Sequence, residues 1–296
     1  MPAMTDRPPP SVTPRPLVVC ADDFGLAAGV SSAIIELIAD GRLSATSCMA
    51  LLPDWRRTAP RLRDTVARHP ADVGLHLTLT DHTPLSAARR LAPGGSLPAL
   101  GRLLPRALAR ALPAAELRDE LHAQLDAFED AWGAPPDYLD GHQHVHVLPL
   151  VREVVLDEIA RRYPAGAVWV RDCVEAPRRC LQRATGVPKA LLISALGWPL
   201  HRQLAARDIP HNAGFSGLHD FSGRRPFGEL MQAFLAATGP APLVHVHPGR
   251  VDAELRACDT LTTPREAELA YLASDRFVSD LAAAGFYPAR LRDCAR

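Results

Sequence analysis

Two adjacent carboxylates, Asp22 and Asp23, follow an apolar run near the start of the chain. Residues 17–20 are all apolar, which predicts a strand covered on both faces, as in a parallel sheet. Such strands carry functional groups at their carboxyl ends. Neighbouring side chains on a strand point in opposite directions, so both acids can serve one site only if the chain bends there, and Gly25 permits a bend. The acids would equally suit the cap of a following helix.

Three histidines stand at alternate positions a little further along the chain: His142, His144 and His146. An extended chain would place all three side chains on one face. A single histidine is more often structural, but a packed core has little use for so much imidazole. We therefore interpret the triplet as part of a metal or catalytic site.

The same residue types recur where other predicted strands end. His76 lies among alternating apolar residues, Asp140 precedes the triplet, and His247 stands before Pro-Gly. In a β/α barrel these ends would meet at one rim. Two imidazoles and one carboxylate leave coordination positions for water and substrate, as in a catalytic metal site. One acid of the early pair would bind the ion while the other takes a proton from water.

Strand-like and helical segments alternate along most of the chain, with no internal repeat and no linker. This pattern predicts an α/β fold in one domain, a closed or nearly closed β/α barrel, with a flat doubly wound sheet as the alternative. Beyond the first strand, the expected strands and extended segments are 44–52, 72–80, 138–146, 167–171 and 242–249. The expected helices are 29–40, 54–69, 114–132, 150–163, 226–238 and 263–284, the last with a capping-box start.

Three segments depart from this alternation. Residues 1–15 hold five prolines and predict a disordered leader before a domain at 16–296. Residues 81–112 are rich in proline and glycine, so we expect a long loop that acts as a lid or contacts substrate. Residues 172–212 mix prolines with short helical fragments, and we expect a second long loop or insertion there.

Bulk composition narrows the class of protein. With 33 basic and 33 acidic residues the formal charge is zero, which argues against a general nucleic-acid or membrane-surface binder. The six cysteines form no C-x-x-C pair, and no segment has the length of a membrane span. We expect a cytoplasmic protein with reduced thiols and a small-molecule partner. The sequence does not decide between a monomer and a homodimer.

Several motifs in combination resemble the YdjC family of carbohydrate deacetylases, which includes chitooligosaccharide deacetylases and a hopanoid-biosynthesis branch. The similarity runs in order from about Pro16 to Gly285. Its motifs are Ala21–Gly25 (ADDFG), Gly74–Leu77 (GLHL), Leu139–His146 (LDGHQHVH), His247–Gly249 (HPG) and Arg265–Leu269 (REAEL).

This resemblance implies a distorted TIM-type barrel of the polysaccharide-deacetylase type that holds one divalent ion. Carried onto this chain, it makes Asp23, His76 and His142 the metal ligands. The family points to magnesium, whereas two imidazole ligands favour zinc, cobalt or iron. We expect magnesium first and keep zinc as the alternative.

The resemblance also implies the catalytic groups. Asp22 corresponds to the general base and His247 to the general acid. Arg171 matches, more loosely, an arginine that orients the base in related deacetylases. The remaining polar residues near these motifs are expected to support the site or bind substrate: Asp140, His144 and His146.

The expected reaction is metal-dependent removal of an N-acetyl group from an amino sugar, in an N-acetylglucosamine-type oligosaccharide or a glycoconjugate. A phosphoesterase on the same metal is one alternative, although the sequence has no G-x-x-x-x-G-K loop and its arginines are dispersed. A sugar-binding barrel without turnover is another, and the intact acids and His247 argue against it.

Overall fold

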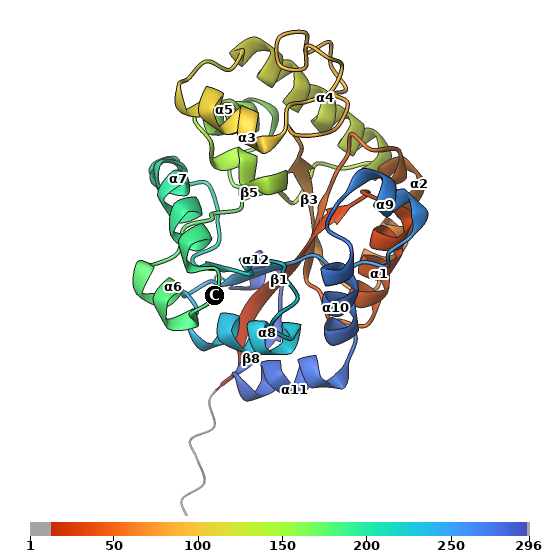
Figure 1. The fold of residues 1–296 in the computed structure, drawn as a ribbon, viewed down its shortest axis with the longest axis vertical. Coiled ribbons are helices and arrows are strands. Elements are labelled where there is room, and N and C mark those ends of the chain that lie inside the picture. Colours follow the sequence, from red (N-terminus) through yellow and green to blue (C-terminus); the bar gives the residue numbers. More distant parts are fainter. Residues whose placement is uncertain (1–12, 295–296) are drawn as a thin grey trace, which may run out of the picture.

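The computed structural model describes residues 13–294, and parallel strands surrounded by helices form its centre (Figure 1). Each strand is parallel to its neighbours in the sheet. The strands are β1 (Arg15–Phe24), β2 (Ala45–Cys48), β3 (Asp72–Leu77), β4 (Tyr138–Gly141), β5 (Trp169–Val170), β6 (Phe215–Ser216), β7 (Leu243–Val246) and β8 (Phe286–Pro288).

The strand order is that of a barrel opened at one place. Neighbours in the sheet run β5-β4-β3-β2-β1-β7-β6, and β8 pairs with the start of β1. In a doubly wound sheet the later strands would begin beside β1 and move outward. Here β6 lies at the edge and β7 then closes on β1. The predicted α/β fold with a parallel sheet is confirmed, and among the described residues a single bridge, Val170 to His211, links the two edges.

Helices connect the strands and cover the outside of the sheet (Figure 1). Within residues 13–294, no helix combines the length and the apolar character needed to cross a membrane. The helices are α1 (Ala28–Ala39), α2 (Pro53–Val66), α3 (Leu100–Leu108), α4 (Ala114–Trp132), η1 (His142–Val147, a 3-10 helix), α5 (Val151–Arg162), α6 (Pro177–Arg183), α7 (Val187–Ala206), α8 (Phe227–Ala236), α9 (Ala253–Cys258), α10 (Thr263–Leu272), α11 (Asp275–Ala283) and α12 (Leu291–Cys294).

The first strand lies at the centre of the core. Residues 17–24 of β1 are buried throughout, because β2 and β7 flank the strand, α1 packs against it, and side chains of other strands such as Tyr138 meet its inner face. This burial agrees with the apolar run seen in the sequence, which is typical of central parallel strands. The carboxyl end of β1 therefore delivers Asp22 and Asp23 to the same rim as the ends of β3, β4 and β7.

Two segments predicted as long loops contain helices. Residues 81–112 include α3, and residues 172–212 include α6 and the 20-residue helix α7. The sequence does not predict α7, because its prolines are typical of loops. Pro188 lies in the first turn of that helix, where a missing N–H has no intrahelical partner to lose, and the helix continues through Pro199.

Three boundaries also differ from the prediction. Residues 138–146 are not extended throughout, because β4 ends at Gly141 and η1 follows. Residues 263–284 form two helices, α10 and α11, and no side-chain capping bond starts α10. The predicted leader 1–15 ends too late, because Arg15 already pairs with Phe286 of β8. Residues 1–12 of that leader lie outside the described residues.

Candidate functional site

The chain bends at the acid pair, as joint use of both carboxylates requires. Asp23 has φ 68° and Gly25 φ 90°, both in the left-handed region. Aspartate is among the few non-glycine residues that enter this region at moderate cost. The residue at the N-cap of α1 is Ala27, and it makes no side-chain capping bond, so the interpretation of the acids as a helix cap is wrong. Both carboxylates are buried.

Asp23 meets two of the predicted histidines. Its Oδ1 atom lies 3.0 Å from His142 Nδ1 and 3.3 Å from His76 Nε2. One ligand atom from each of the three residues lies within 4.8 Å of the others. His142 is partly buried and the other two are almost fully buried. Three donor atoms of this kind, converging from three separate elements, suit a divalent cation.

The strand register fixes the orientation of the His76 ring. His76 in β3 is paired with Asp140 in β4, so both side chains lie on the same face of the sheet. His76 Nδ1 donates to Asp140 Oδ1 at 2.6 Å, which directs Nε2 toward Asp23. A carboxylate behind a histidine is the usual partner of a metal-binding imidazole.

The pKa of His76 indicates that positive charge is stabilised at this position. Burial alone would lower that pKa, but the carboxylates of Asp140 and Asp23 outweigh burial and raise it to about 10. A cation bound by Nε2 would be stabilised by the same two carboxylates. The donor set therefore fits a divalent ion by its charge as well as by its geometry.

Asp22 is held by a different partner. Arg171 donates from Nη1 to Asp22 Oδ2 at 2.8 Å and from Nη2 to Asp22 Oδ1 at 2.5 Å. Burial would raise the pKa of the Asp22 carboxyl, but the Arg171 guanidinium outweighs it and holds that pKa well below its ordinary value. Arg171 also contacts Asp140 Oδ2 at 2.6 Å, so one buried guanidinium links the two carboxylates.

Two histidines at the end of β7 face Asp22. His245 Nδ1 lies 3.7 Å and His247 Nε2 lies 4.0 Å from Asp22 Oδ2. Neither ring nitrogen of His245 has a hydrogen-bond partner among the described residues, and the ring stacks on Phe215. Burial lowers the pKa of both imidazoles.

The histidine triplet does not act as one face. Gln143 and His144 have φ values of 52° and 59°, so the chain turns sharply after β4 and the three side chains separate. His142 points to Asp23, His144 lies against His245, and His146 Nε2 donates to the carbonyl of Arg171 at 3.0 Å. The predicted common face is wrong, because an extended segment was assumed where a 3-10 turn forms.

Residues of α10 that carried part of the family resemblance support the site from outside the strands. Arg265 donates to Asp23 Oδ2 at 2.6 Å, and Glu268 accepts the backbone N–H of His247 at 2.6 Å. Positions three apart share one face of a helix. The sequence reasoning assigned neither residue a role. The available signal was an arginine in the first turn of the helix predicted from residue 263, where the helix dipole disfavours positive charge.

One cavity of about 530 Å³ is lined by most of these polar side chains: Asp22, Asp23, His76, His142, His245, His247 and Arg265. His144 also reaches it, whereas Arg171, Asp140 and His146 lie behind its wall. Much of the remaining wall is apolar and comes from α3, α7 and a loop. Helix α3 lies within residues 81–112, the segment predicted as a lid or substrate loop, whereas the sequence did not predict the part that comes from α7. The apolar and amphipathic residues of this wall are Leu100, Leu104, Lys189, Leu192, Ile193, Leu196 and Phe221.

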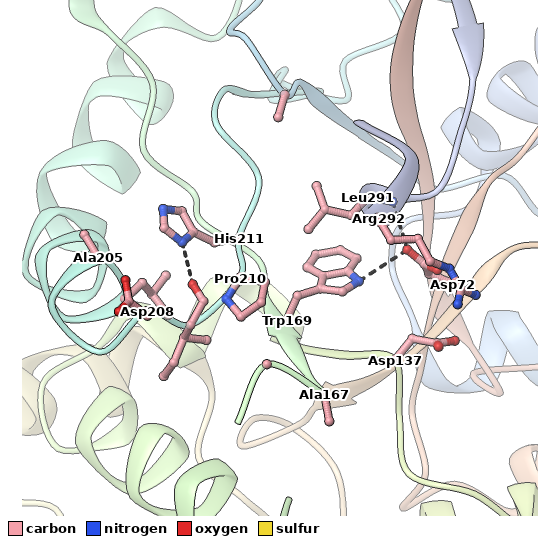
Figure 2. A pocket seen from close by; sticks show the side chains of 14 residues that line it. Asp72, Asp137, Ala167, Trp169, Ala205, Asp208, Pro210, His211, Leu291 and Arg292 are labelled. Carbon is pink, nitrogen blue, oxygen red and sulfur yellow. Dashed lines mark hydrogen bonds between the residues drawn. The ribbon is translucent and has the colours of Figure 1, made fainter. Parts of the chain in front are cut away.

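A second cavity of about 670 Å³ lies at the opposite ends of the strands (Figure 2). Asp72, the first residue of β3, and Asp137, just before β4, face it together with Trp169 and Leu291. None of the predicted catalytic or metal-binding residues lines this cavity. In parallel α/β folds the chemistry takes place at the carboxyl ends of the strands, so the smaller cavity is the candidate active site.

A solved structure shares the fold of this chain. A protein from Enterococcus faecalis V583, described as a candidate cellobiose-phosphate cleavage protein, has the same fold with a TM-score of 0.72 and 19% identity. The superposition covers 96% of this chain and 100% of that chain. At this identity the likeness concerns the fold alone.

Sequence relatives cover a shorter part. Chitooligosaccharide deacetylases of Yersinia pestis and Yersinia pseudotuberculosis are 37% identical to this chain over 141 residues, 47% of this chain and 53% of theirs. The match thus spans about half the length of these relatives. The family model described as YdjC-like protein matches residues 16–283, nearly all of the described chain. This chain therefore belongs to the YdjC-like family.

Proposed function

We propose that this protein hydrolyses the N-acetyl group of an amino sugar with the help of one divalent metal ion. The observation that carries the proposal is the convergence of Asp23, His76 and His142 within one cavity that also holds Asp22 and His247. The deacetylase activity named for the Yersinia relatives supports the same reaction class.

Asp23, His76 and His142 would hold the ion. Bound there, a divalent ion polarises an amide carbonyl and lowers the pKa of water. Asp23 suits the ligand role better than Asp22, because Asp23 Oδ1 faces both imidazoles while Arg171 occupies both oxygens of Asp22. Magnesium is the first expectation from the family resemblance, and the two imidazoles make zinc the alternative.

Asp22 is the proposed general base. It borders the cavity, and its contact with Arg171 keeps it ionised and fixes its orientation. The water that attacks the acetyl carbonyl would lose its proton to this carboxylate. Arg171 and Asp140, buried behind the site, would act by positioning Asp22 and His76.

His247 is the proposed general acid. An amide nitrogen leaves badly unless it is protonated, so the cavity needs a proton donor near the departing amine. Glu268 fixes the backbone of His247, and Nε2 of its ring faces Asp22. His245, on the same side of β7, lies beside His247 with a ring-centroid distance of 5.1 Å. We assign it a supporting role.

The apolar wall of the cavity bears on the substrate class. Leu192, Ile193 and Leu196 of α7 face the cavity, and α3 adds Leu100 and Leu104. Such surface binds apolar groups more readily than a chain of hydroxylated sugar rings. This favours a glycoconjugate in which the acetylated amino sugar is attached to an apolar group over a long oligosaccharide.

Phosphoester hydrolysis is less well supported. Among the described residues that line the cavity, the cations are Arg265 and Lys189, and Arg265 is already paired with Asp23 and Asp259. A transferred phosphoryl group needs several cationic or N–H donors around its oxygens.

The test is acetate release measured with chitobiose, longer oligomers and glycolipid-linked N-acetylglucosamine, beside a panel of phosphoesters. We expect acetate release, and a loss of about 100-fold or more in Asp22→Asn and in His247→Ala with the metal still bound. His76→Ala should lose the metal itself, which elemental analysis detects. Wild-type acetate release by both catalytic variants would refute the assigned roles.

A further inference from the structure

A second set of one carboxylate and two imidazoles lies outside the active-site cavity. Asp172 follows β5, His201 lies in the C-terminal half of α7, and His211 precedes β6. One ligand atom from each residue lies within 4.8 Å of the others. We propose that Asp172, His201 and His211 form a second metal site, specific for a transition-metal ion such as zinc, that fastens α7 to the edges of the sheet.

The carboxylate of this set is buried and rigidly placed. Asp172 is 2% exposed. Its backbone N–H donates to the side-chain oxygen of Asn212 at 2.8 Å, and the Asn212 amide donates back to the Asp172 carbonyl at 2.8 Å. Asp172 Oδ1 accepts from the backbone of Val174 at 2.9 Å, which leaves Oδ2 directed at His201. The carboxylate is thus fixed before any ligand binds.

The two imidazoles are oriented as metal ligands usually are. His211 Nδ1 donates to the carbonyl of Ile209 at 2.8 Å, which leaves Nε2 as the free lone pair (Figure 2). A backbone carbonyl behind one ring nitrogen is a common device for fixing the tautomer of a metal-binding histidine. His201 Nδ1 lies 2.6 Å from Asp172 Oδ2, and the ring stacks on Trp198.

A hydrogen bond between Asp172 and His201 accounts for only part of this arrangement. A buried carboxylate oxygen needs a polar partner, and His201 Nδ1 provides one for Asp172 Oδ2 at 2.6 Å. His211 adds no hydrogen bond to that pair, yet its ring lies 5.8 Å from the ring of His201, edge to face. A shared ion explains why both rings are gathered at one carboxylate.

The chemistry of the donors selects the kind of ion. Two imidazoles and one carboxylate suit zinc, cobalt or nickel, whereas magnesium prefers oxygen ligands. Three protein ligands leave the remaining positions to water, and the site is open enough for this, since the side chain of His201 is 34% exposed. His211 also borders the 670 Å³ cavity, which gives ions a route to the site.

The position of this second set, between α7 and the sheet, points to a structural role for the ion. The N-terminal half of α7 lines the active-site cavity through Lys189, Leu192 and Ile193. The C-terminal half carries His201, and a β-bridge pairs Val170 of β5 with His211, in the segment that leads to β6. An ion held by Asp172, His201 and His211 would join α7 to the chain beside β5 and β6. It would thereby stabilise one wall of the active site without touching substrate.

The experiment measures zinc content and thermal stability in the full chain. On the proposed function, the variant His76→Ala should lack the active-site metal, so zinc retained by it reports on the second site. We expect about one zinc ion per chain in His76→Ala and none in His76→Ala/His201→Gln or His76→Ala/His211→Gln. Zinc should raise the melting temperature of His76→Ala and leave both double variants unchanged.

His69→Gln in the His76→Ala background is the matched control, because His69 is exposed and lies outside both sets. It should bind zinc as His76→Ala does. Circular dichroism identifies any variant that fails to fold, and the use of two independent histidine changes keeps the test decisive. Equal zinc binding in His76→Ala and both double variants, or no zinc in His76→Ala, would overturn the proposal and leave the proposed deacetylase function unaffected.

Discussion

Arg171 donates two hydrogen bonds to Asp22, one to each carboxylate oxygen. The guanidinium is fully buried and also contacts Asp140, which in turn holds His76. A planar fork of this kind fixes the direction of a carboxylate as well as its charge. Arg171 thereby connects the proposed base to the proposed metal ligands through one chain of contacts.

Replacing Arg171 should separate its effect on the orientation of Asp22 from its effect on the charge balance of the buried carboxylates. Arg171→Lys keeps the charge but loses the bidentate geometry, so we expect a folded protein with kcat lowered about 10- to 100-fold and KM little changed. Arg171→Met leaves two buried carboxylates uncompensated and should lower the free energy of unfolding by about 3–5 kcal/mol. Urea unfolding and steady-state acetate release measure the two outcomes. A lysine variant with wild-type kcat would contradict the positioning role.

Asp140→Asn tests the carboxylate behind His76. The substitution removes the charge that stabilises positive charge on the ring while keeping the size of the side chain. We expect the affinity for the active-site metal to fall about 10- to 100-fold, as is typical when the partner of a metal-binding histidine is changed. Isothermal titration calorimetry measures this. Asp137→Asn, three residues earlier and at the opposite end of β4, is the matched control and should bind metal normally.

Glu268→Ala tests the support of His247 by α10. The substitution leaves the buried N–H of His247 without its acceptor, which should lower the free energy of unfolding by about 1–3 kcal/mol and reduce kcat. Glu268→Gln keeps an oxygen in place and should restore most of the activity. If the alanine and glutamine variants are equally impaired, the carboxylate acts in some way other than as an acceptor.

Asp72 makes stability depend on pH at the end of the sheet remote from the active site (Figure 2). Burial and the nearby Asp137 carboxylate raise the pKa of Asp72 from its ordinary value of 3.8 to about 6. The folded protein therefore binds this proton more tightly than the unfolded chain. The resulting stabilisation is fully present below pH 3.8 and is lost as pH rises through about 6.

Asp72→Asn should remove this dependence. Between about pH 4 and pH 7 the wild-type free energy of unfolding should decline by up to about 3 kcal/mol relative to the variant, since one pKa unit corresponds to about 1.4 kcal/mol. Asparagine still offers an oxygen to Trp169 Nε1 and to the backbone of Leu291. Urea unfolding across this pH range measures the decline in the free energy of unfolding. Asp64→Asn is the control, because Asp64 is exposed. Parallel profiles for wild type and Asp72→Asn would disprove the raised pKa.

Sequence reasoning named most of the polar residues that line the candidate site, because strand ends bring distant residues together. Asp22, Asp23, His76 and His247 each follow or end an apolar strand-like run, and a β/α arrangement predicts that such positions converge. The structure places all four in one cavity. The alternation of strands and helices likewise sufficed for the α/β class and the parallel sheet.

The parts that were missed depend on information that local pattern does not contain. The turn after Gly141 requires a left-handed backbone conformation at Gln143 and His144. The alternating histidines in the sequence do not indicate this conformation. The contact between Arg265 and Asp23 joins residues 242 positions apart. The sequence does not predict helix α7, because proline usually ends a helix. Pro188, however, lies in the first turn, a position where helices accept proline.

The most direct test of the central claim is acetate release by the wild-type protein after its metal is removed with a chelator and then restored. The assay uses the best acetylated amino-sugar substrate found in the panel. We predict that the metal-free protein loses acetate release by at least about 100-fold and that magnesium or zinc restores it. Undiminished acetate release by the metal-free protein would contradict metal-dependent deacetylation at Asp23, His76 and His142.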